Sequence, residues 1–120
     1  MLTNSSLLKE HGYVNGQWVG DDAKSRFDVT NAYSNEVISS LPDMGKKETD
    51  EAIDAANNAW PEWRARTAKE RAIILKKWFD LIMANQEDLA ILMTAEQGKP
   101  IAEARGEVGY GASFIEWFAE

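Results

Sequence analysis

The sequence changes its texture near Gly45, and this change most limits the folds open to the chain. Before this point, short apolar runs are interrupted by Gly, Asn and Asp; after it, apolar residues recur every three or four positions. The first pattern is typical of short strands joined by tight turns, and the second of amphipathic helices. We therefore predict an α+β chain, with hairpins at about 12–42 and helices at about 46–120.

Two hairpins are predicted in the first part. In the first, the pair Asn15-Gly16 separates two short apolar runs, and such a pair suits the left-handed dihedral angles of a tight turn. In the second, residues 27–30 and 36–38 flank a polar turn. Asn35 can take the positive φ in that turn which glycine adopts at lower cost.

Three to four helices are predicted after the hairpins. Pro61 is expected to end the first of them, because proline removes a helical hydrogen bond. Thr67 and Glu70 have the spacing of a capping box, which would start the second. Gly98 is a natural C-terminal stop for the third, and Pro100 suits the first turn of the last.

Glycines and aromatic residues in the helical part indicate surfaces that pack closely. Gly106, Gly109 and Gly111 each cost a helix about 1 kcal/mol relative to alanine, which suggests a close backbone contact. Helical spacing favours core or interface packing over a ligand pocket for the large aromatics Trp60, Trp63, Trp78, Phe79, Phe114, Trp117 and Phe118. Five tryptophans are many for a small acidic domain, so an apolar interface is expected.

Charge and composition exclude several functional classes. Thirteen basic against twenty acidic residues give a net charge of -7, which disfavours nucleic-acid binding and leaves no basic patch for an anionic membrane. No run of about 20 apolar residues is present, and residues 1–10 match no signal or transit peptide, so a cytoplasmic protein is predicted. The absence of cysteine excludes disulfides, thiolate metal sites and thiol catalysis within this chain.

No set of residues in the sequence predicts catalysis. His11 is the only histidine, has no obvious acidic partner, and is expected to be a solvated surface residue. The glycine-rich run 106–111 matches neither a dinucleotide-binding nor a Walker pattern. A cluster of acids is better explained by the positive end of a helix dipole than by a metal site: Glu48, Asp50, Glu51 and Asp54.

Several segments, in order along nearly the whole chain, resemble the start of the aldehyde dehydrogenase superfamily. They are similar to its N-G-x-W strand, its V-x-N-P-A-T-G-E-V-I stretch, its first two helices and its E-x-G-K-P hallmark: residues 13–19, 29–38, 52–63, 67–75 and 96–100. Residues 114–120 are most similar to the succinate-semialdehyde branch. Two mild departures occur, since Ala32 and Asn35 stand where the family usually has proline and glycine.

This resemblance implies an oxidoreductase that converts an aldehyde to a carboxylic acid with NAD or NADP through a cysteine thioester. Succinate semialdehyde is the expected substrate, and glutarate semialdehyde fits nearly as well. In the family the catalytic residues lie later in the chain, so none can be assigned here. Residues 1–120 would then be an incomplete part of a cofactor-binding domain, inactive alone, in a homodimer or homotetramer whose complete subunit binds the cofactor.

The resemblance also implies a monovalent-cation site made of main-chain carbonyl groups. In many family members the ligands occupy positions that match Val29 or Thr30 and Glu96. Carbonyl oxygens are suitable ligands for hard cations. These three residues are the predicted metal ligands of the chain.

Two other hypotheses stay open beside the aldehyde dehydrogenase. One is a complete, non-catalytic interaction module derived from the same domain, which binds a partner through exposed aromatic residues. The other is a helical protein that binds a small molecule and resembles the family by chance. The ordered motifs disfavour the second. The number of tryptophans, together with a last helix that reaches Glu120 without a capping signal, favours a piece of the enzyme over the interaction module.

Overall fold

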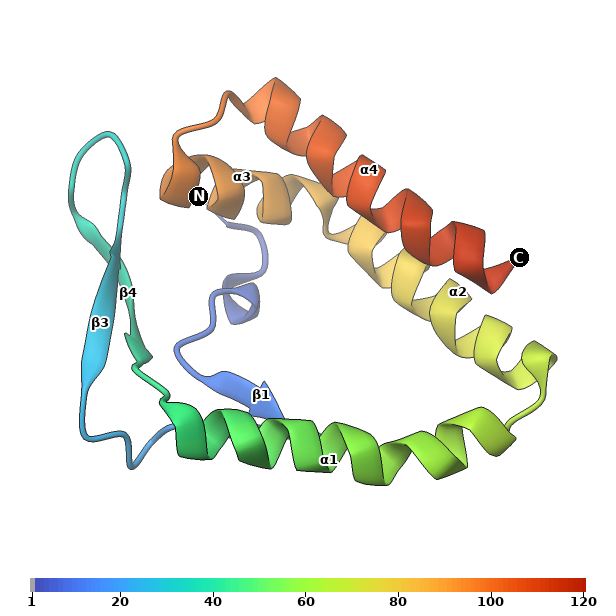
Figure 1. The fold of residues 1–120 in the computed structure, drawn as a ribbon. Helices are drawn as coiled ribbons and strands as arrows, with labels where there is room; N and C mark the ends of the chain where they lie inside the picture. The colour runs from blue at the N-terminus through green and yellow to red at the C-terminus, as the bar shows by residue number, and fades with distance from the viewer. Residues whose placement is uncertain (1) are drawn as a thin grey trace.

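The computed structural model describes residues 2–120, so Met1 lies outside the described residues. The elements, in chain order, are η1 (Ser5–Leu7), β1 (Gly12–Val14), β2 (Gln17–Val19), β3 (Arg26–Thr30), β4 (Val37–Pro42), α1 (Lys46–Ala65), α2 (Ala68–Ala84), α3 (Gln86–Gln97) and α4 (Ile101–Ala119). The strands form two antiparallel hairpins, β1–β2 and β3–β4, and four helices follow them (Figure 1). The predicted α+β class is confirmed.

The β1–β2 hairpin has the turn that its sequence predicts. Asn15 and Gly16 have φ values of 51° and 76°, so both central residues of the turn are left-handed. Tyr13 pairs with Trp18 across the strands, and their ring centroids lie 4.8 Å apart. This contact between aromatic side chains adds to the backbone pairing of a very short ladder.

The β3–β4 hairpin has a more irregular shape. Asn35 adopts a φ of 60°, as predicted, and its N–H donates to the Asn31 carbonyl at 2.9 Å. The Asn31 side chain also accepts hydrogen bonds from two backbone N–H groups of the turn, which fixes the loop. The ladder is irregular between Val29 and Thr30.

The expectation that Pro61 ends the first helix is wrong, because α1 continues through it to Ala65. A proline inside a helix leaves the carbonyl four residues earlier, here that of Asn57, without its usual donor. Asn57 and its neighbours are exposed, so water can hydrate this carbonyl. The predicted capping box at the start of α2 is confirmed: Thr67 Oγ1 accepts from the Glu70 N–H at 3.3 Å, and Glu70 Oε2 accepts from the Thr67 N–H at 2.7 Å.

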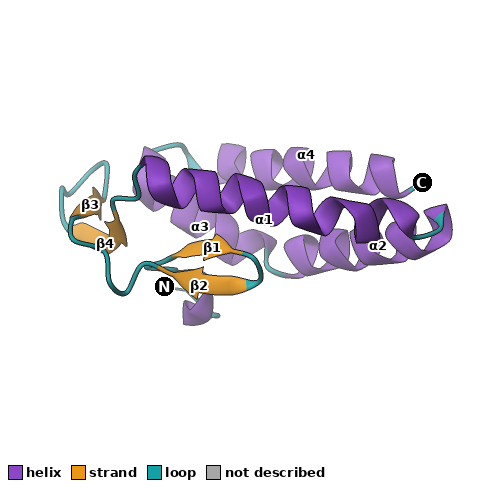
Figure 2. Ribbon diagram, turned by 60° about the horizontal axis from the view of Figure 1, so that its bottom comes forward, coloured by secondary structure: helices purple, strands orange, loops and turns teal. Residues whose placement is uncertain are grey.

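Small residues make up the buried core between the helices. Ala90 of α3 and Ala104 of α4 are fully buried, and Val108 next to them is 7% exposed. Ala112 of α4 is also buried, at 1% exposure. Helix α4 packs along α2 and α3. Figure 2 shows β3–β4 beyond the end of the helices that lies opposite the C-terminus, and β1–β2 alongside α1. Such small side chains let the helix backbones approach closely.

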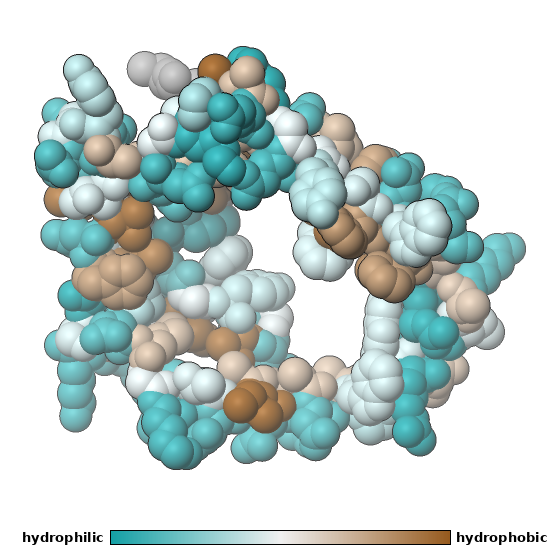
Figure 3. All heavy atoms as spheres, turned by 45° about the horizontal axis from the view of Figure 1, so that its top comes forward, coloured by the Kyte–Doolittle hydropathy of each residue, from teal (hydrophilic) through white to brown (hydrophobic). Residues whose placement is uncertain are grey.

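The chain is more open than a self-contained domain of its size. Its radius of gyration is 16.7 Å, whereas about 13.6 Å is expected for 120 residues. Its accessible surface is 8934 Å², whereas a folded monomer of this mass exposes roughly 6,500 Å². A space-filling view shows an opening through the middle of the molecule (Figure 3). None of the helices within residues 2–120 has the length and apolar character that a membrane span requires.

Candidate functional site

The C-terminal end of α3 meets the turn of the β3–β4 hairpin, and the predicted cation ligands lie on both sides of this junction. The Ala32 N–H donates to the Ala95 carbonyl at 3.0 Å. Thr30 precedes Ala32 by two residues, and Glu96 follows Ala95 directly. The structure therefore brings together two segments that lie more than sixty positions apart in the sequence.

Regular hydrogen bonding is interrupted on both sides of the junction. Gly98 ends α3 with a left-handed φ of 81°, and its N–H donates to the Thr94 carbonyl at 2.8 Å. The helical partner of the Glu96 carbonyl would be the N–H of residue 100, but proline has none. On β3, the irregularity at Val29 and Thr30 disturbs the ladder. The junction thus has the kind of backbone that can offer carbonyl oxygens to a ligand.

Side chains provide no comparable site for a metal ion. Across residues 2–120, no group of three or more His, Cys, Asp or Glu residues is arranged to hold one. On α1, Glu48 Oε2 accepts from the Gly45 N–H at 2.9 Å, and Asp50 pairs with Lys46 one turn away. The interpretation of the acidic cluster as helix capping is confirmed for Glu48, whereas Asp50 makes a surface ion pair that was not predicted.

His11 differs from its prediction because it does have an acidic partner. Its Nε2 lies 2.6 Å from Asp21 Oδ1, and the Asp21 side chain is 92% exposed. The partner was not predicted because it follows the β1–β2 hairpin, ten residues further along the chain. Because the contact is exposed to solvent, this pair is a surface contact.

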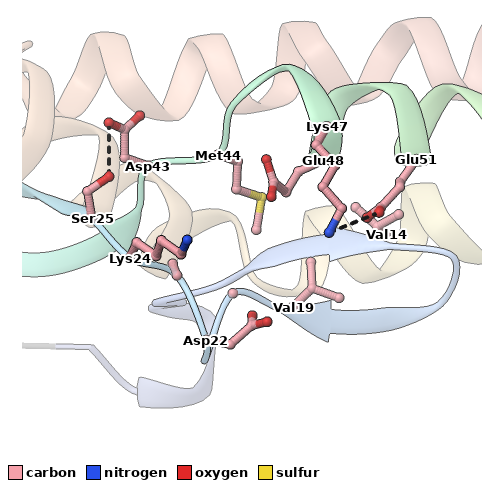
Figure 4. A pocket seen from close by; sticks show the side chains of 12 residues that line it. Val14, Val19, Asp22, Lys24, Ser25, Asp43, Met44, Lys47, Glu48 and Glu51 are labelled. Atoms are coloured by element: carbon pink, nitrogen blue, oxygen red, sulfur yellow. Dashed lines mark hydrogen bonds and ion pairs between the residues drawn. The ribbon is translucent and has the colours of Figure 1, made fainter.

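A shallow pocket of about 510 Å³ lies between the β1–β2 hairpin and the start of α1. Its lining combines apolar Val14, Val19 and Met44 with side chains of both charges (Figure 4). Lys47 pairs with Glu51 at 3.6 Å, so these charges satisfy one another. The Ser25 hydroxyl donates to Asp43 Oδ2 at 3.4 Å, a long contact between exposed side chains, and the pocket is best described as the seam between the hairpin and α1.

Two ion pairs join α4 to its neighbours and shift the pKa values of their members. Arg105 donates two hydrogen bonds to the Glu87 carboxylate, at 2.6 and 2.8 Å, which lowers the pKa of Glu87 and raises that of Arg105. The Lys76 ammonium lies 2.7 Å from Glu120, and this contact lowers the pKa of Glu120 and raises that of Lys76.

The sign of each shift sets the pH range in which the pair stabilises the fold. A carboxylate with a lowered pKa contributes stability above its unfolded-state pKa, and this contribution is lost as the pH falls through the folded-state value. For Lys76, whose pKa is raised, the contribution is lost as the pH rises through the folded-state value. All four groups are exposed, so the stabilisation is small.

Helix α4 exposes its large side chains and buries its small ones. Tyr110, Phe114, Trp117 and Phe118 are 66%, 49%, 76% and 74% exposed, and we call these four residues the aromatic face. Tyr110 and Phe114 contact each other edge to face, with ring centroids 5.0 Å apart. A group of large exposed aromatic side chains on one helix face is unusual for the surface of a self-contained monomer.

The glycines of α4 make no close backbone contact among the described residues, contrary to the packing that was predicted. A Cβ atom added at Gly106 or Gly111 would meet nothing within 4 Å, and one at Gly109 would lie 3.5 Å from Gln86 Nε2. The close backbone contact is therefore not made within residues 2–120.

Two polar contacts that hold the chain together had no signal in the sequence. Asp88 is buried in the first turn of α3, and Arg26 donates to carbonyl groups of three different segments. Acids in a first helical turn are common, so only the fold distinguishes Asp88 from Glu87 beside it.

Comparison with known proteins identifies the family of the chain, which its geometry alone does not. The chain matches the model of the Aldehyde dehydrogenase family over residues 18–120. It is 56% identical over 119 residues to the NADP(+) succinate-semialdehyde dehydrogenase of Escherichia coli, a match that covers 99% of this chain and 25% of that protein. It is 54% identical over 119 residues to the glutarate-semialdehyde dehydrogenase of Pseudomonas putida, with the same coverage of 99% and 25%.

Solved structures agree with the sequence relatives. An aldehyde dehydrogenase from Brucella melitensis biovar abortus superimposes with a TM-score of 0.93 and 55% identity, over 98% of this chain and 24% of that one. An NADP dependent enzyme from Escherichia coli gives a TM-score of 0.94 and 55% identity, over 99% and 25%. The chain spans about a quarter of the length of the curated relatives it matches. By sequence and by fold, it belongs to the aldehyde dehydrogenase family.

Proposed function

We propose that this chain is the N-terminal part of an enzyme that oxidises a short semialdehyde, such as succinate or glutarate semialdehyde, to the carboxylic acid. The identity of 54–56% to a succinate- and a glutarate-semialdehyde dehydrogenase, over 99% of the chain, supports this proposal most directly. In this reaction NAD or NADP accepts the hydride. The substrate would be an aldehyde that carries a carboxylate at its other end, as do the semialdehydes after which both relatives are named.

The proposed chemistry places the reacting groups outside these residues. A thioester mechanism needs a cysteine thiolate, and this chain has no cysteine. Residues 1–120 would therefore form an incomplete part of the cofactor-binding domain and be inactive alone. Their task would be structural: the aromatic face and the open middle of the chain would pack against the rest of the polypeptide, in a subunit of a homodimer or homotetramer. A cytoplasmic location stays a prediction from the sequence.

The complete protein is expected to reduce NAD or NADP with succinate or glutarate semialdehyde, and residues 1–120 alone are expected to give no turnover. Absorbance at 340 nm would measure both, with each cofactor tested against each aldehyde. A neutral aldehyde of the same length serves as the control for recognition of the acidic group. Turnover by residues 1–120 would contradict the thioester mechanism, and an inactive complete protein would favour the interaction module.

We also propose that the carbonyl groups of Val29, Thr30 and Glu96 bind a monovalent cation in the complete protein. The contact between Ala32 and Ala95, and the interrupted hydrogen bonding on both sides of it, support this site. A cation there would join β3 to α3, so its binding would stabilise the folded state, and the stabilisation would rise with the logarithm of the cation concentration above its Kd.

Potassium chloride is expected to raise the melting temperature of the complete protein above its value in choline chloride at equal ionic strength. Gly98→Ala should remove this difference, because Gly98 is left-handed and an added Cβ would lie 3.2 Å from the Ala32 Cβ. Gly16→Ala is the matched control: its φ is also positive, at 76°, but no atom lies within 4 Å of the added Cβ. If the unchanged protein and both variants show the same difference in melting temperature between the two salts, the proposed cation site is wrong.

A further inference from the structure

The segment ahead of β1, residues 2–11, is held at its start by a buried carboxylate. We call this segment the strap. Asp88, in the first turn of α3, is only 5% exposed. Its Oδ1 accepts a hydrogen bond from the Thr3 N–H at 2.8 Å, and its Oδ2 accepts one from the Asn4 N–H at 2.7 Å. Both oxygens of the carboxylate are therefore used by two successive backbone donors, more than eighty residues away in the sequence.

The strap has a local structure that presents these donors. Asn4 caps the short helix η1, since its Oδ1 accepts from the Ser6 N–H at 3.1 Å and from Ser6 Oγ at 2.6 Å. The cap fixes the backbone at Asn4 before η1 begins. Consecutive backbone N–H groups that point the same way form a concave site for an anion, and here the anion is a side chain of the same chain.

The other end of the strap is fixed by Arg26 of β3. Its Nη2 donates to the Glu10 carbonyl at 2.8 Å and to the Ser40 carbonyl at 2.7 Å. Its Nη1 donates to the Gly20 carbonyl at 3.2 Å. One guanidinium thus ties the strap to the end of the first hairpin and to β4 of the second. Figure 1 shows the strap running from α3 to β1.

We infer that the strap sets the position of α3 relative to the two hairpins. The strap is held in place by its hydrogen bonds to Asp88, which we call the latch. Helix α3 is then held at both ends, by the strap at Asp88 and by the β3–β4 turn at Ala95. Opening the strap would break two hydrogen bonds to one charged carboxylate together, which is costlier than releasing a backbone segment that makes no such contact. The strap therefore opens as a unit rather than fraying residue by residue.

A simpler role for Asp88 is to complement the positive end of the α3 dipole. That role would stabilise α3 whether or not the strap is present. The latch, by contrast, requires Thr3 and Asn4. The two roles can be separated by a variant of Asp88 tested with and without these residues.

Hydrogen exchange in the complete protein would measure the latch directly. Slow exchange is expected for the backbone amides of residues 3–8 in the unchanged protein. Asp88→Asn should accelerate it by about tenfold to a hundredfold, because the amide NH₂ faces a donor where the carboxylate had accepted one. Glu103→Gln is the matched control: it removes one carboxylate from an exposed first-turn position of α4 that makes no hydrogen bond or ion pair within residues 2–120. Free exchange of the strap in the unchanged protein, or no effect of Asp88→Asn, would overturn the proposal.

A shortened protein that lacks residues 2–4 completes the test and does not depend on the aldehyde activity. Its melting temperature should be lower than that of the intact protein, because Asp88 loses both donors. Adding Asp88→Asn to the shortened protein should cause no further loss, whereas the same change in the intact protein should lower the melting temperature. An equal loss in both backgrounds would assign Asp88 to the helix dipole and end the latch proposal. If the Asp88→Asn protein fails to fold, the shortened protein still tests the proposal. It must then have a lower melting temperature than the intact protein.

Discussion

Replacing Ala104 with leucine is expected to destabilise the protein by about 3 kcal/mol, at the upper end of the range for adding methylenes to a packed core. Ala104 is fully buried and lies in the cluster with Ala90 and Val108, where α4 crosses α3. A leucine side chain there would have to separate the two helices. The Arg105–Glu87 pair beside it would be pulled apart at the same time.

Ala102→Leu is the matched control for this change. It adds the same atoms to the same helix, two residues earlier, at a position that is exposed in this structure. Thermal and urea unfolding of the complete protein would measure both variants. Similar losses for the two would mean that α4 does not pack on α3 through its small residues, and the described core would be wrong.

Features set by neighbouring residues could be predicted from the sequence. The positive φ values of Asn15, Gly16 and Asn35 and the left-handed Gly98 all follow from the conformational freedom of those residue types. The capping box at Thr67 follows from the reach of one side chain over one helical turn. Each of these needs only a few residues to form, and each is present.

Features that depend on what lies across the fold were predicted poorly. One local prediction also failed: Pro61 was expected to end α1, but the helix continues to Ala65, and exposure lets water hydrate the Asn57 carbonyl that proline leaves without a donor. The latch at Asp88 needs a donor segment more than eighty residues away. Helical spacing assigned the aromatic residues to a core or an interface. Only the exposed fractions of their side chains in the structure distinguish the two. The carbonyl ligands remain predictions, because every residue has a main-chain carbonyl and the residue type does not show which of them binds a cation.

Trp117→Ala is expected to be nearly neutral in the isolated chain and strongly destabilising in the complete protein. Trp117 is 76% exposed here, so its removal from residues 1–120 should change their stability by no more than about 0.5 kcal/mol, as for most surface positions. In the complete protein we expect a loss of about 3–5 kcal/mol, the cost of removing a buried tryptophan side chain. The difference follows from the proposal that the rest of the polypeptide covers the aromatic face.

Tyr33→Ala tests whether this difference is specific to the aromatic face. Tyr33 is 95% exposed in the turn of the β3–β4 hairpin, away from α4, and a single exposed aromatic residue on a loop is ordinary surface. Its removal should cost little in either protein. Circular dichroism for residues 1–120, and thermal unfolding with activity for the complete protein, would give the four values. If Trp117→Ala costs no more than Tyr33→Ala in the complete protein, the aromatic face stays exposed there and must be covered by another molecule. That outcome would favour the interaction-module hypothesis over the enzyme fragment, because the excess surface of this chain would then have no partner within its own polypeptide.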